Sequence, residues 1–276
     1  MSLRMIDRAA IEATLDEFDS IGREAFLTKY GYSTATTYVL RRNGRFYDPK
    51  AVVGVANRFT PDGQSLRHDQ LDASEGIAHL KRLGFEVLPF NGLWWVNQGD
   101  TYRAERNGGY VWAPQQIKGG HSVTHHTNVS KLRVGQLVVH HSVNLIRAIG
   151  TVAEAPYTAT RPAELSGGIW QEEGYLCPVD YFELPEPIPH GDIPDRESND
   201  ATPFDVRGVP KQQYLIQVST SFCFPLLEFL NSRIPNLFDR PVTHPHLENP
   251  EERLPKTMDT RNPIIAALRA FKNVVL

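Results

Sequence analysis

The sequence has few of the features that mark secreted or membrane proteins. Its 276 residues include only two cysteines, Cys177 and Cys223, too few for a disulfide framework in a chain of this length. No apolar run approaches the roughly 18 residues needed to span a bilayer. Asp7, Arg8 and Glu12 interrupt the N-terminus before the apolar core of a signal peptide can form. These absences predict a cytoplasmic protein with reduced thiols and no membrane partner.

The motifs of common catalytic sites are also missing from the sequence. There is no GxxxxGKS or GxxxxGKT phosphate loop, and no nucleophile-elbow pattern surrounds Ser142. A zinc site needs three or four converging ligands. The histidines between residues 121 and 141 have no cysteine or carboxylate cluster beside them, and neighbours such as His140 and His141 face opposite sides of a strand. We therefore expect no catalytic residue, no metal and no cofactor in this chain.

Residues 1–90 have the pattern of a small domain of helices and one hairpin. Apolar residues at helical spacing predict a helix over residues 6–30. Asn43-Gly44 between two apolar runs predicts a β-hairpin, because a type I′ turn needs positive φ at both central positions. A helix is expected to follow Asp48-Pro49, with Asp48 as its N-cap. Another helix is expected to begin at Ser74 as its N-cap and to end at Gly84.

From residue 92 to about residue 235 the pattern changes to short strands joined by loops. Strands are expected over 93–97, 110–113, 136–142, 145–152, 176–184 and 214–218, with helices over 126–132 and 222–233. The Pro-, Asp- and Gly-rich stretch 186–211 predicts a long loop. This pattern favours a closed or half-closed β-barrel with flanking helices, so the fold class is predicted to be α+β.

The C-terminal residues suggest a third unit. Prolines scattered among charges give residues 236–262 the composition of an inter-domain linker. Residues 263–271 then predict a helix, and Val274-Val275-Leu276 has the pattern of a buried strand. A domain that begins with these elements would continue beyond residue 276, so residues 263–276 are expected to be its incomplete start.

Charge is distributed unevenly within the strand-rich part. Residues 101–150 contain six basic residues against the single acid Glu105, whereas residues 151–200 contain eleven acids against two arginines. A basic stretch with interleaved aromatics is typical of a surface that contacts phosphates and stacks bases. The alternative is a solvated face balanced by the acidic segment. The candidate phosphate-contacting residues of this stretch are Arg103, Arg106, Lys118, Lys131 and Arg133.

The tryptophans of this part differ in their settings. Trp94 and Trp95 are neighbours on one expected strand, so at least one of them must face a core. Trp112 follows two glycines and precedes Ala113-Pro114 at a strand edge. An aromatic ring in that position can stack on a flipped base, which is worth roughly 1–3 kcal/mol. The alternative is that Trp112 also belongs to the core.

Residues 92–235 resemble the EVE-like domains that are fused to McrB-type motors, and the wider EVE/YTH pattern of the PUA-like superfamily. The segments that carry the resemblance are Trp94–Tyr102, Gly108–Pro114, His125–Gln136, Val139–Asn144 and Gly150–Ala153. The resemblance implies a PUA-like barrel pocket that accepts a flipped modified base. In EVE-like domains that base is methylated cytosine or a relative, and in YTH domains it is methylated adenine in RNA.

The same resemblance assigns candidate residues to the pocket. Trp112 becomes a wall of the pocket, and His126 and His141 stand where such domains often place larger aromatics. The polar candidates for reading base edges or fixing loops are Asn97, Gln98, Asn128 and Ser142. The two histidines depart from the usual pattern, so the identity of the base stays open.

Two further resemblances concern the ends of the chain. Gly44–Val52 and Leu80–Val87 resemble the N-terminal head domain of ScoMcrA-like restriction endonucleases, which would cover residues 1–90. Arg45, Tyr47 and Lys50 then become candidates for DNA contact, unless they only shape the junction between hairpin and helix.

Asn262–Leu276 resembles the helix and first strand of McrB-type AAA+ GTPase domains, in which the Walker A loop follows. The resemblance implies GTP or ATP, Mg²⁺ and a homo-oligomer for that motor, and none of these for this chain.

Together these observations predict the DNA-reading part of a modification-dependent restriction factor of the McrB type. The barrel would flip a methyl- or hydroxymethylcytosine-class base, and the basic stretch would hold the phosphates. In the full protein, a motor would then recruit a nuclease subunit. The alternatives are a reader of modified RNA, a protein-interaction or assembly module without nucleic-acid binding, and a sensor of a small molecule.

Overall fold

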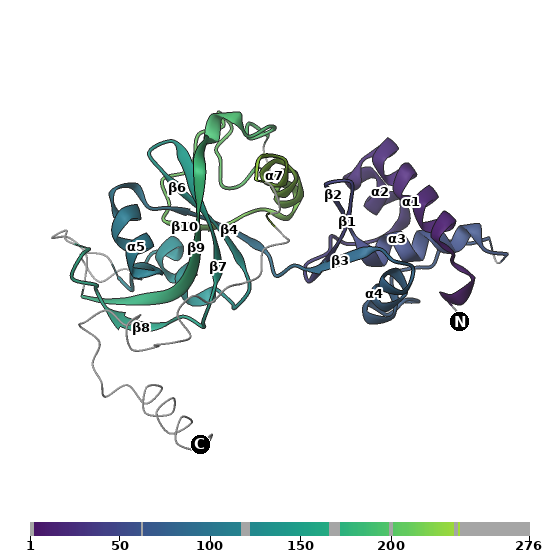
Figure 1. Ribbon diagram of the computed structural model, residues 1–276, viewed down its shortest axis with the longest axis horizontal. Coiled ribbons are helices and arrows are strands. Elements are labelled where there is room, and N and C mark those ends of the chain that lie inside the picture. The colour runs from purple at the N-terminus through teal and green to yellow at the C-terminus, as the bar shows by residue number, and fades with distance from the viewer. Residues whose placement is uncertain are drawn as a thin grey trace, which may run out of the picture.

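The computed structural model describes residues 3–61, 63–116, 122–165, 172–198, 201–234 and 237. Figure 1 shows a helical head joined to a strand-rich part that curls into a half-barrel. Apart from Leu237, the predicted linker 236–262 and the predicted start of a motor domain lie outside the described residues. None of the helices in the described ranges combines the length and apolar character needed to cross a bilayer.

The head is built on a three-stranded antiparallel sheet in the order β2-β1-β3, covered by helices. Its helices and strands are η1 Leu3–Met5, α1 Arg8–Ile21, α2 Arg23–Tyr30, β1 Tyr38–Arg42, β2 Arg45–Tyr47, α3 Pro49–Ala56, η2 Asn57–Phe59, α4 Ala73–Arg82 and β3 Glu86–Pro89. The apolar face of α1, with Ile11, Leu15 and Phe18, packs with Val52 of α3 in one buried cluster. Two helices, α1 and α2, precede the hairpin of β1 and β2, and α3 and α4 follow it.

Glycines fix two features of the head. The predicted hairpin forms, with φ of 52° at Asn43 and 80° at Gly44. The predicted single helix over residues 6–30 is wrong, because Gly22, at φ 82°, ends α1 and begins α2. A residue with a Cβ is strained in this left-handed region, which glycine enters freely.

Two predicted helix caps are corrected by the structure. Asp48 precedes α3, but its side chain makes no capping hydrogen bond to that helix. It instead accepts two hydrogen bonds from Arg23 and one from the backbone nitrogen of Ala35. The N-cap of α4 is Asp72 rather than Ser74, because the Asp72 carboxylate accepts from the backbone nitrogen of Ser74.

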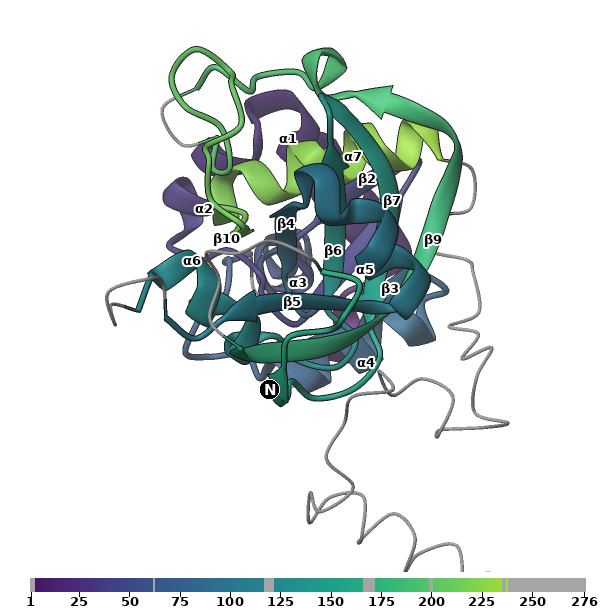
Figure 2. The same cartoon turned by 90° about the vertical axis from the view of Figure 1, so that its left-hand side faces the viewer.

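The second part is a seven-stranded sheet in the order β10-β4-β6-β7-β9-β5, with β8 paired to β9. Its elements are β4 Leu93–Asn97, η3 Gly99–Thr101, α5 Tyr102–Gly108, β5 Tyr110–Pro114, α6 Thr124–Thr127, η4 Asn128–Lys131, β6 Leu137–Ser142, β7 Leu145–Val152, β8 Tyr157–Thr160, β9 Glu173–Pro189, η5 His190–Asp192, β10 Leu215–Gln217 and α7 Thr220–Arg233. In Figure 2, β5 runs across the direction of β4, β6 and β7, which shows how the sheet curls. The mixed α+β class and the half-barrel are as predicted.

Some elements of this part were not predicted. The long strand β9 reaches Pro189, so it includes the start of the predicted loop 186–211. The helix α5 and the strand β8 lie where no element was expected.

Strand β4 separates two cores. Trp94 and Val96 face the inside of the curl, where they join residues such as Val138. Trp95 faces the opposite side and packs in the cluster that contains α7 and Phe204. Both neighbouring tryptophans are therefore buried, one on each face of the strand.

The head and the second part meet at α7. The guanidinium of Arg23 lies over the ring of Phe224, with its carbon 3.2 Å from the ring centroid. The same guanidinium donates two hydrogen bonds, of 2.8 and 2.9 Å, to the buried carboxylate of Asp48. Nearby, the Glu228 carboxylate accepts a hydrogen bond of 3.1 Å from the backbone nitrogen of Phe46. Phe46 also belongs to the apolar cluster of α7, so the two parts share one core.

We predict that Arg23→Ala lowers the free energy of unfolding by about 3–5 kcal/mol, because it leaves the buried Asp48 carboxylate without its cation. It also removes the guanidinium that covers Phe224. Urea denaturation measures the change. Arg67→Ala is the matched control, since Arg67 and its partner Asp69 are both exposed, and no measurable change is expected. A loss below about 1 kcal/mol for Arg23→Ala would contradict the prediction.

Candidate functional site

The parallel pairing of β4 with β6 creates the candidate site. Asn97 at the end of β4 lies opposite His141 near the end of β6. Parallel strands end at the same edge of a sheet, so the residues after both strands also meet there. The hydroxyl of Ser142 donates a hydrogen bond of 2.7 Å to the carbonyl of Gly99. Four predicted pocket residues therefore lie at one edge of the sheet, and we call this group the strand-end site: Asn97, Gln98, His141 and Ser142.

The inner side of the strand-end site holds a buried polar network centred on Glu105. Gln98 Nε2 donates to Glu105 Oε2 at 2.9 Å, and Gln98 Oε1 accepts from His140 Nδ1 at the same distance. The hydroxyls of Thr101 and Tyr214 also bind the Glu105 carboxylate. Glu105, a residue only 1% exposed, is thus held by Gln98 and Thr101 from the segment between β4 and α5, and by Tyr214 just before β10.

Burial sets the protonation of this network. It raises the pKa of Glu105 to about 7, although the hydrogen bonds from Thr101, Tyr214 and Gln98 act in the opposite direction. Burial also lowers the pKa of His140 to about 3, so that imidazole is neutral at physiological pH. Its ring lies 4.0 Å from the Tyr181 ring. In the sequence, Glu105 stands out only as the single acid of a basic stretch. That isolation was the one sequence feature that could have marked Glu105 as part of the site.

His140 also explains a glycine on the neighbouring strand. A Cβ at Gly150 would lie 2.3 Å from His140 Nε2, which is a clash. The ring therefore packs directly on the backbone of β7. Nε2 is buried and has no hydrogen-bond partner among the described residues. The contact leaves no room for a ligand there, so we assign His140 to the packing of the site.

The outer side of the strand-end site is a chain of hydrogen bonds with a fixed direction. Asn97 Oδ1 accepts from Trp95 Nε1 at 2.8 Å, and an indole nitrogen only donates. His141 Nδ1, 2.9 Å from the same oxygen, must therefore carry a proton. The unprotonated His141 Nε2 then accepts from His190 Nδ1 at 3.2 Å. Burial lowers the pKa of His141 to about 4, helped by His190 and Arg147.

Asn97 also holds a loop. Its Nδ2 donates to the carbonyls of Lys211 and Gln213, at 2.9 and 2.7 Å. Over the described ranges, no group of three or more His, Cys, Asp or Glu side chains is arranged to hold a metal ion.

A second group of predicted residues surrounds the start of β10. Asn128 Nδ2 donates to the carbonyl of Leu215 at 2.9 Å. His125 Nδ1 accepts from the backbone nitrogen of Tyr214 at 3.1 Å, and the His126 ring lies 6.5 Å from the Tyr214 ring. Burial lowers the pKa of His126 to about 4, and its buried Nδ1 has no hydrogen-bond partner in the described ranges. Tyr214 joins this group to the Glu105 network.

The structure places Trp112 in a third environment. Its backbone nitrogen donates to the Tyr214 hydroxyl at 3.0 Å, which ties β5 to the same network. Its ring is 2% exposed and packs with Ala159, Leu165 and Leu176. A Cβ at Gly174 would lie within 2.5 Å of three ring atoms, so the indole rests on bare backbone. A base can stack on the Trp112 ring only after the residues packed against that ring move. The role of Trp112 as a pocket wall therefore stays a prediction.

The predicted phosphate-contacting residues also lie in different settings. Arg103, Lys131 and Arg133 are exposed and form no ion pair with an acid of the described residues. Arg106 pairs with Glu183, and Arg45 pairs with Asp19 at 2.7 Å. Lys50 is half-buried at the start of α3, while Lys118 lies outside the described residues. The first three are therefore the cations best placed for a polyanion.

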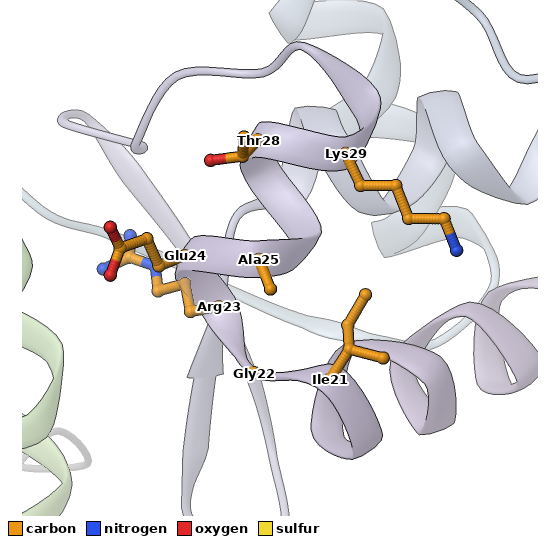
Figure 3. A pocket seen from close by; sticks show the side chains of 7 residues that line it. All are labelled: Ile21, Gly22, Arg23, Glu24, Ala25, Thr28 and Lys29. Carbon is orange, nitrogen blue, oxygen red and sulfur yellow. The ribbon is translucent and has the colours of Figure 1, made fainter.

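The head has an open hollow of its own at the break between α1 and α2, shown in Figure 3. Ile21, Gly22, Arg23, Glu24, Ala25, Thr28 and Lys29 line it. The guanidinium of Arg23 is already held by Asp48 and Phe224, and the ammonium of Lys29 bonds to Glu17. Both cations beside this hollow therefore already bind other side chains. The strand-end site remains the better candidate for a functional site.

Comparison with known proteins gives one family match. Residues 4–89 match the family described as the ScoMcrA-like, N-terminal head domain. This range agrees with the head described above and supports the predicted resemblance for residues 1–90. No curated protein matches the chain. The EVE-like and motor resemblances stay predictions.

Solved structures give only distant likenesses. A protein from Pseudomonas syringae shares 10% identity, with a TM-score of 0.34, over 52% of this chain and 100% of its own. A protein from Rhodopseudomonas palustris shares 13%, with the same TM-score, over 56% of this chain and 97% of its own. The type IV phosphorothioation-dependent restriction endonuclease ScoMcrA shares 26%, with a TM-score of 0.22, over 47% of this chain and 20% of its own. TM-scores this low establish neither a fold nor a function.

Glu105→Gln is predicted to change how stability depends on pH. A carboxyl with an ordinary pKa of 4.5 and a folded pKa of about 7 binds an extra proton on folding between these values. Its contribution is fully present below pH 4.5 and is lost as the pH rises through 7. The unfolding free energy of the wild type should therefore fall relative to the variant by about 1.4 kcal/mol per pH unit in this window. Denaturant titrations from pH 4.5 to 8 measure it, and parallel profiles would contradict it.

Proposed function

We propose that this chain is the DNA-reading part of a modification-dependent restriction protein, which flips a modified base out of the duplex. The observation that carries the proposal is the match of residues 4–89 to the ScoMcrA-like head domain. The family takes its name from ScoMcrA, which is described as a restriction endonuclease, and this supports a role of the head in a restriction protein. We assign base reading to the second part and the strand-end site, as in an EVE-like domain of the PUA-like superfamily.

The geometry of the second part supports this assignment. Asn97, Gln98 and His141 converge at one edge, where each is held by hydrogen bonds to neighbouring side chains. Groups fixed in this way can discriminate between base edges, because an unmatched buried polar group is costly. The half-buried His126 beside Tyr214 would supply a ring for stacking, and its Nδ1 has no hydrogen-bond partner among the described residues.

The exposed cations support binding to a nucleic-acid backbone. Lys131 and Arg133 flank the end of η4, on the segment that also carries Asn128. They would contact phosphates while the strand-end site contacts the base. Catalysis is not assigned to this chain. Nucleotide hydrolysis with Mg²⁺, oligomerisation and nuclease recruitment would belong to a motor domain beyond the described residues.

We predict tighter binding to one modified duplex. The ligands are matched duplexes carrying cytosine, 5-methylcytosine, 5-hydroxymethylcytosine, N6-methyladenine or a phosphorothioate linkage, the last because ScoMcrA is described as phosphorothioation-dependent. His126→Ala should weaken the preferred complex by about tenfold, the loss expected for one stacked ring. Trp112→Phe keeps a smaller ring and should weaken the complex less than about tenfold. Fluorescence anisotropy measures the affinities.

His68→Ala is the matched control for His126, because His68 is exposed on the head, and its affinities should equal those of the wild type. Melting curves of Trp112→Phe show whether the buried site stays folded. Equal binding to all duplexes would contradict base reading. Preference for a modified RNA would replace DNA by RNA as the target, and no binding to any nucleic acid would favour an assembly module.

The salt dependence of binding tests the phosphate surface separately. Replacing both Lys131 and Arg133 by alanine should lower the slope of log affinity against log salt concentration by about two, one for each lost contact. The preference between duplexes should stay the same, since phosphates carry no sequence information. Arg67→Ala, a paired arginine on the head, serves as control. An unchanged slope would place the phosphate contacts elsewhere.

A further inference from the structure

The turn between β6 and β7 has an unusual tip. Ser142 pairs with Leu145, so Val143 and Asn144 are the two central residues of the hairpin. Both have left-handed backbone conformations, with φ of 49° and 63°. Asparagine enters this region readily, whereas a β-branched residue such as valine does so rarely. The Val143 side chain is nevertheless 66% exposed, so no buried contact compensates for this conformation.

The other two-residue hairpin in this protein provides a comparison. The β1–β2 turn has the same left-handed pair of conformations at Asn43 and Gly44, the residues that this turn favours. A stable β6–β7 turn therefore does not require valine, and glycine or asparagine at position 143 would suit the backbone better. The valine thus points to a role outside the folding of the turn.

The tip is held rigidly by residues of the strand-end site. The Ser142 hydroxyl donates to the Gly99 carbonyl, and Arg147 Nε donates to the Ser142 carbonyl at 3.2 Å. On the other side, the backbone nitrogen of His190 donates to the Asn144 carbonyl at 3.0 Å. Because His190 also binds His141, the position of the tip is fixed relative to the groups that we assign to base reading.

We propose that Val143 is the wedge that enters the base stack of duplex DNA when a base is flipped toward the strand-end site. This inference rests on the proposed function. Proteins that unstack DNA insert short apolar side chains between base steps, and the insertion offsets part of the cost of opening the stack. A stiff, exposed valine at a rigid tip has the size and apolar character for this contact.

The surroundings of the tip fit a nucleic acid. Arg147 lies behind the turn, with its guanidinium 5.8 Å from the centroid of the Tyr102 ring. The exposed Arg103 follows in the first turn of α5. Asp100 lies in η3, directly before α5. We expect both arginines to contact the backbone beside the opened step.

The experiment compares Val143→Asn and Val143→Gly with the wild type. Both variants suit the left-handed turn and remove the apolar tip. The ligands are the modified duplex, the unmodified duplex, the modified single strand, and a duplex in which the modified base faces an abasic site. We expect about tenfold weaker binding of the modified duplex, and little loss on the single strand or the abasic duplex, where no stack must be opened. Val143→Asn should keep or raise the Tm.

Val134→Ser is the matched control, because Val134 is another exposed valine, at the opposite end of β6, and should bind as the wild type does. If the wild type prefers a modified duplex and both Val143 variants bind that duplex as tightly as the wild type does, the role of Val143 as a wedge is wrong and base reading stands. If the wild type binds all duplexes alike but the variants lose duplex binding only, the wedge stands and modified-base reading is wrong. Equal losses on single strand and duplex, or no binding by the wild type, overturn the wedge.

Discussion

The parallel pairing of β4 with β6 is the constraint on which the second part depends. Every other strand pair in its sheet is antiparallel, so this one pair forces the intervening chain to cross over and return in the same direction. The crossover carries α5, β5 and α6, and with them Glu105 and His126. The strands therefore end together while the crossover supplies the groups around them. The candidate site is a consequence of this topology rather than of a local motif.

Burial of polar groups gives the site its rigidity. Glu105 is enclosed by Thr101, Gln98 and Tyr214. The Tyr214 hydroxyl also accepts from a backbone nitrogen of β5, and the Tyr214 backbone nitrogen donates to the His125 ring of α6. Such a network is costly if any member is lost, because the remaining groups stay buried without partners. The same principle holds at the junction with the head, where Arg23 serves both the buried Asp48 and the ring of Phe224. Polar contacts thus fix positions that apolar packing alone leaves loose.

The sequence predicts the local features well and the long-range ones poorly. Alternation and turn residues located β4, β7 and the Asn43-Gly44 hairpin, since these depend on neighbours in the chain. The partner of Asp48 was missed, because Arg23 lies 25 residues away along the chain. The break between α1 and α2 was missed although Gly22 itself was the local signal for it. At the site, the types of Asn97, Gln98 and His141 were informative, but no pattern pairs Glu105 with Tyr214, which lie 109 residues apart. The burial of Trp112 was predicted only as the alternative to its role in the pocket, since its surroundings depend on Gly174 and Leu176 across the sheet.

The place of β10 in the sheet has a consequence for the order of folding. This strand pairs with β4 across a separation of about 120 residues, whereas the head's hairpin closes over a two-residue turn. Local pairings form quickly, and distant ones wait for the loss of chain entropy to be offset. During synthesis the head can fold while β4 still has no partner on either side. The core shared by α7, Phe46 and Phe90 is then completed last, after β10 and α7 have left the ribosome.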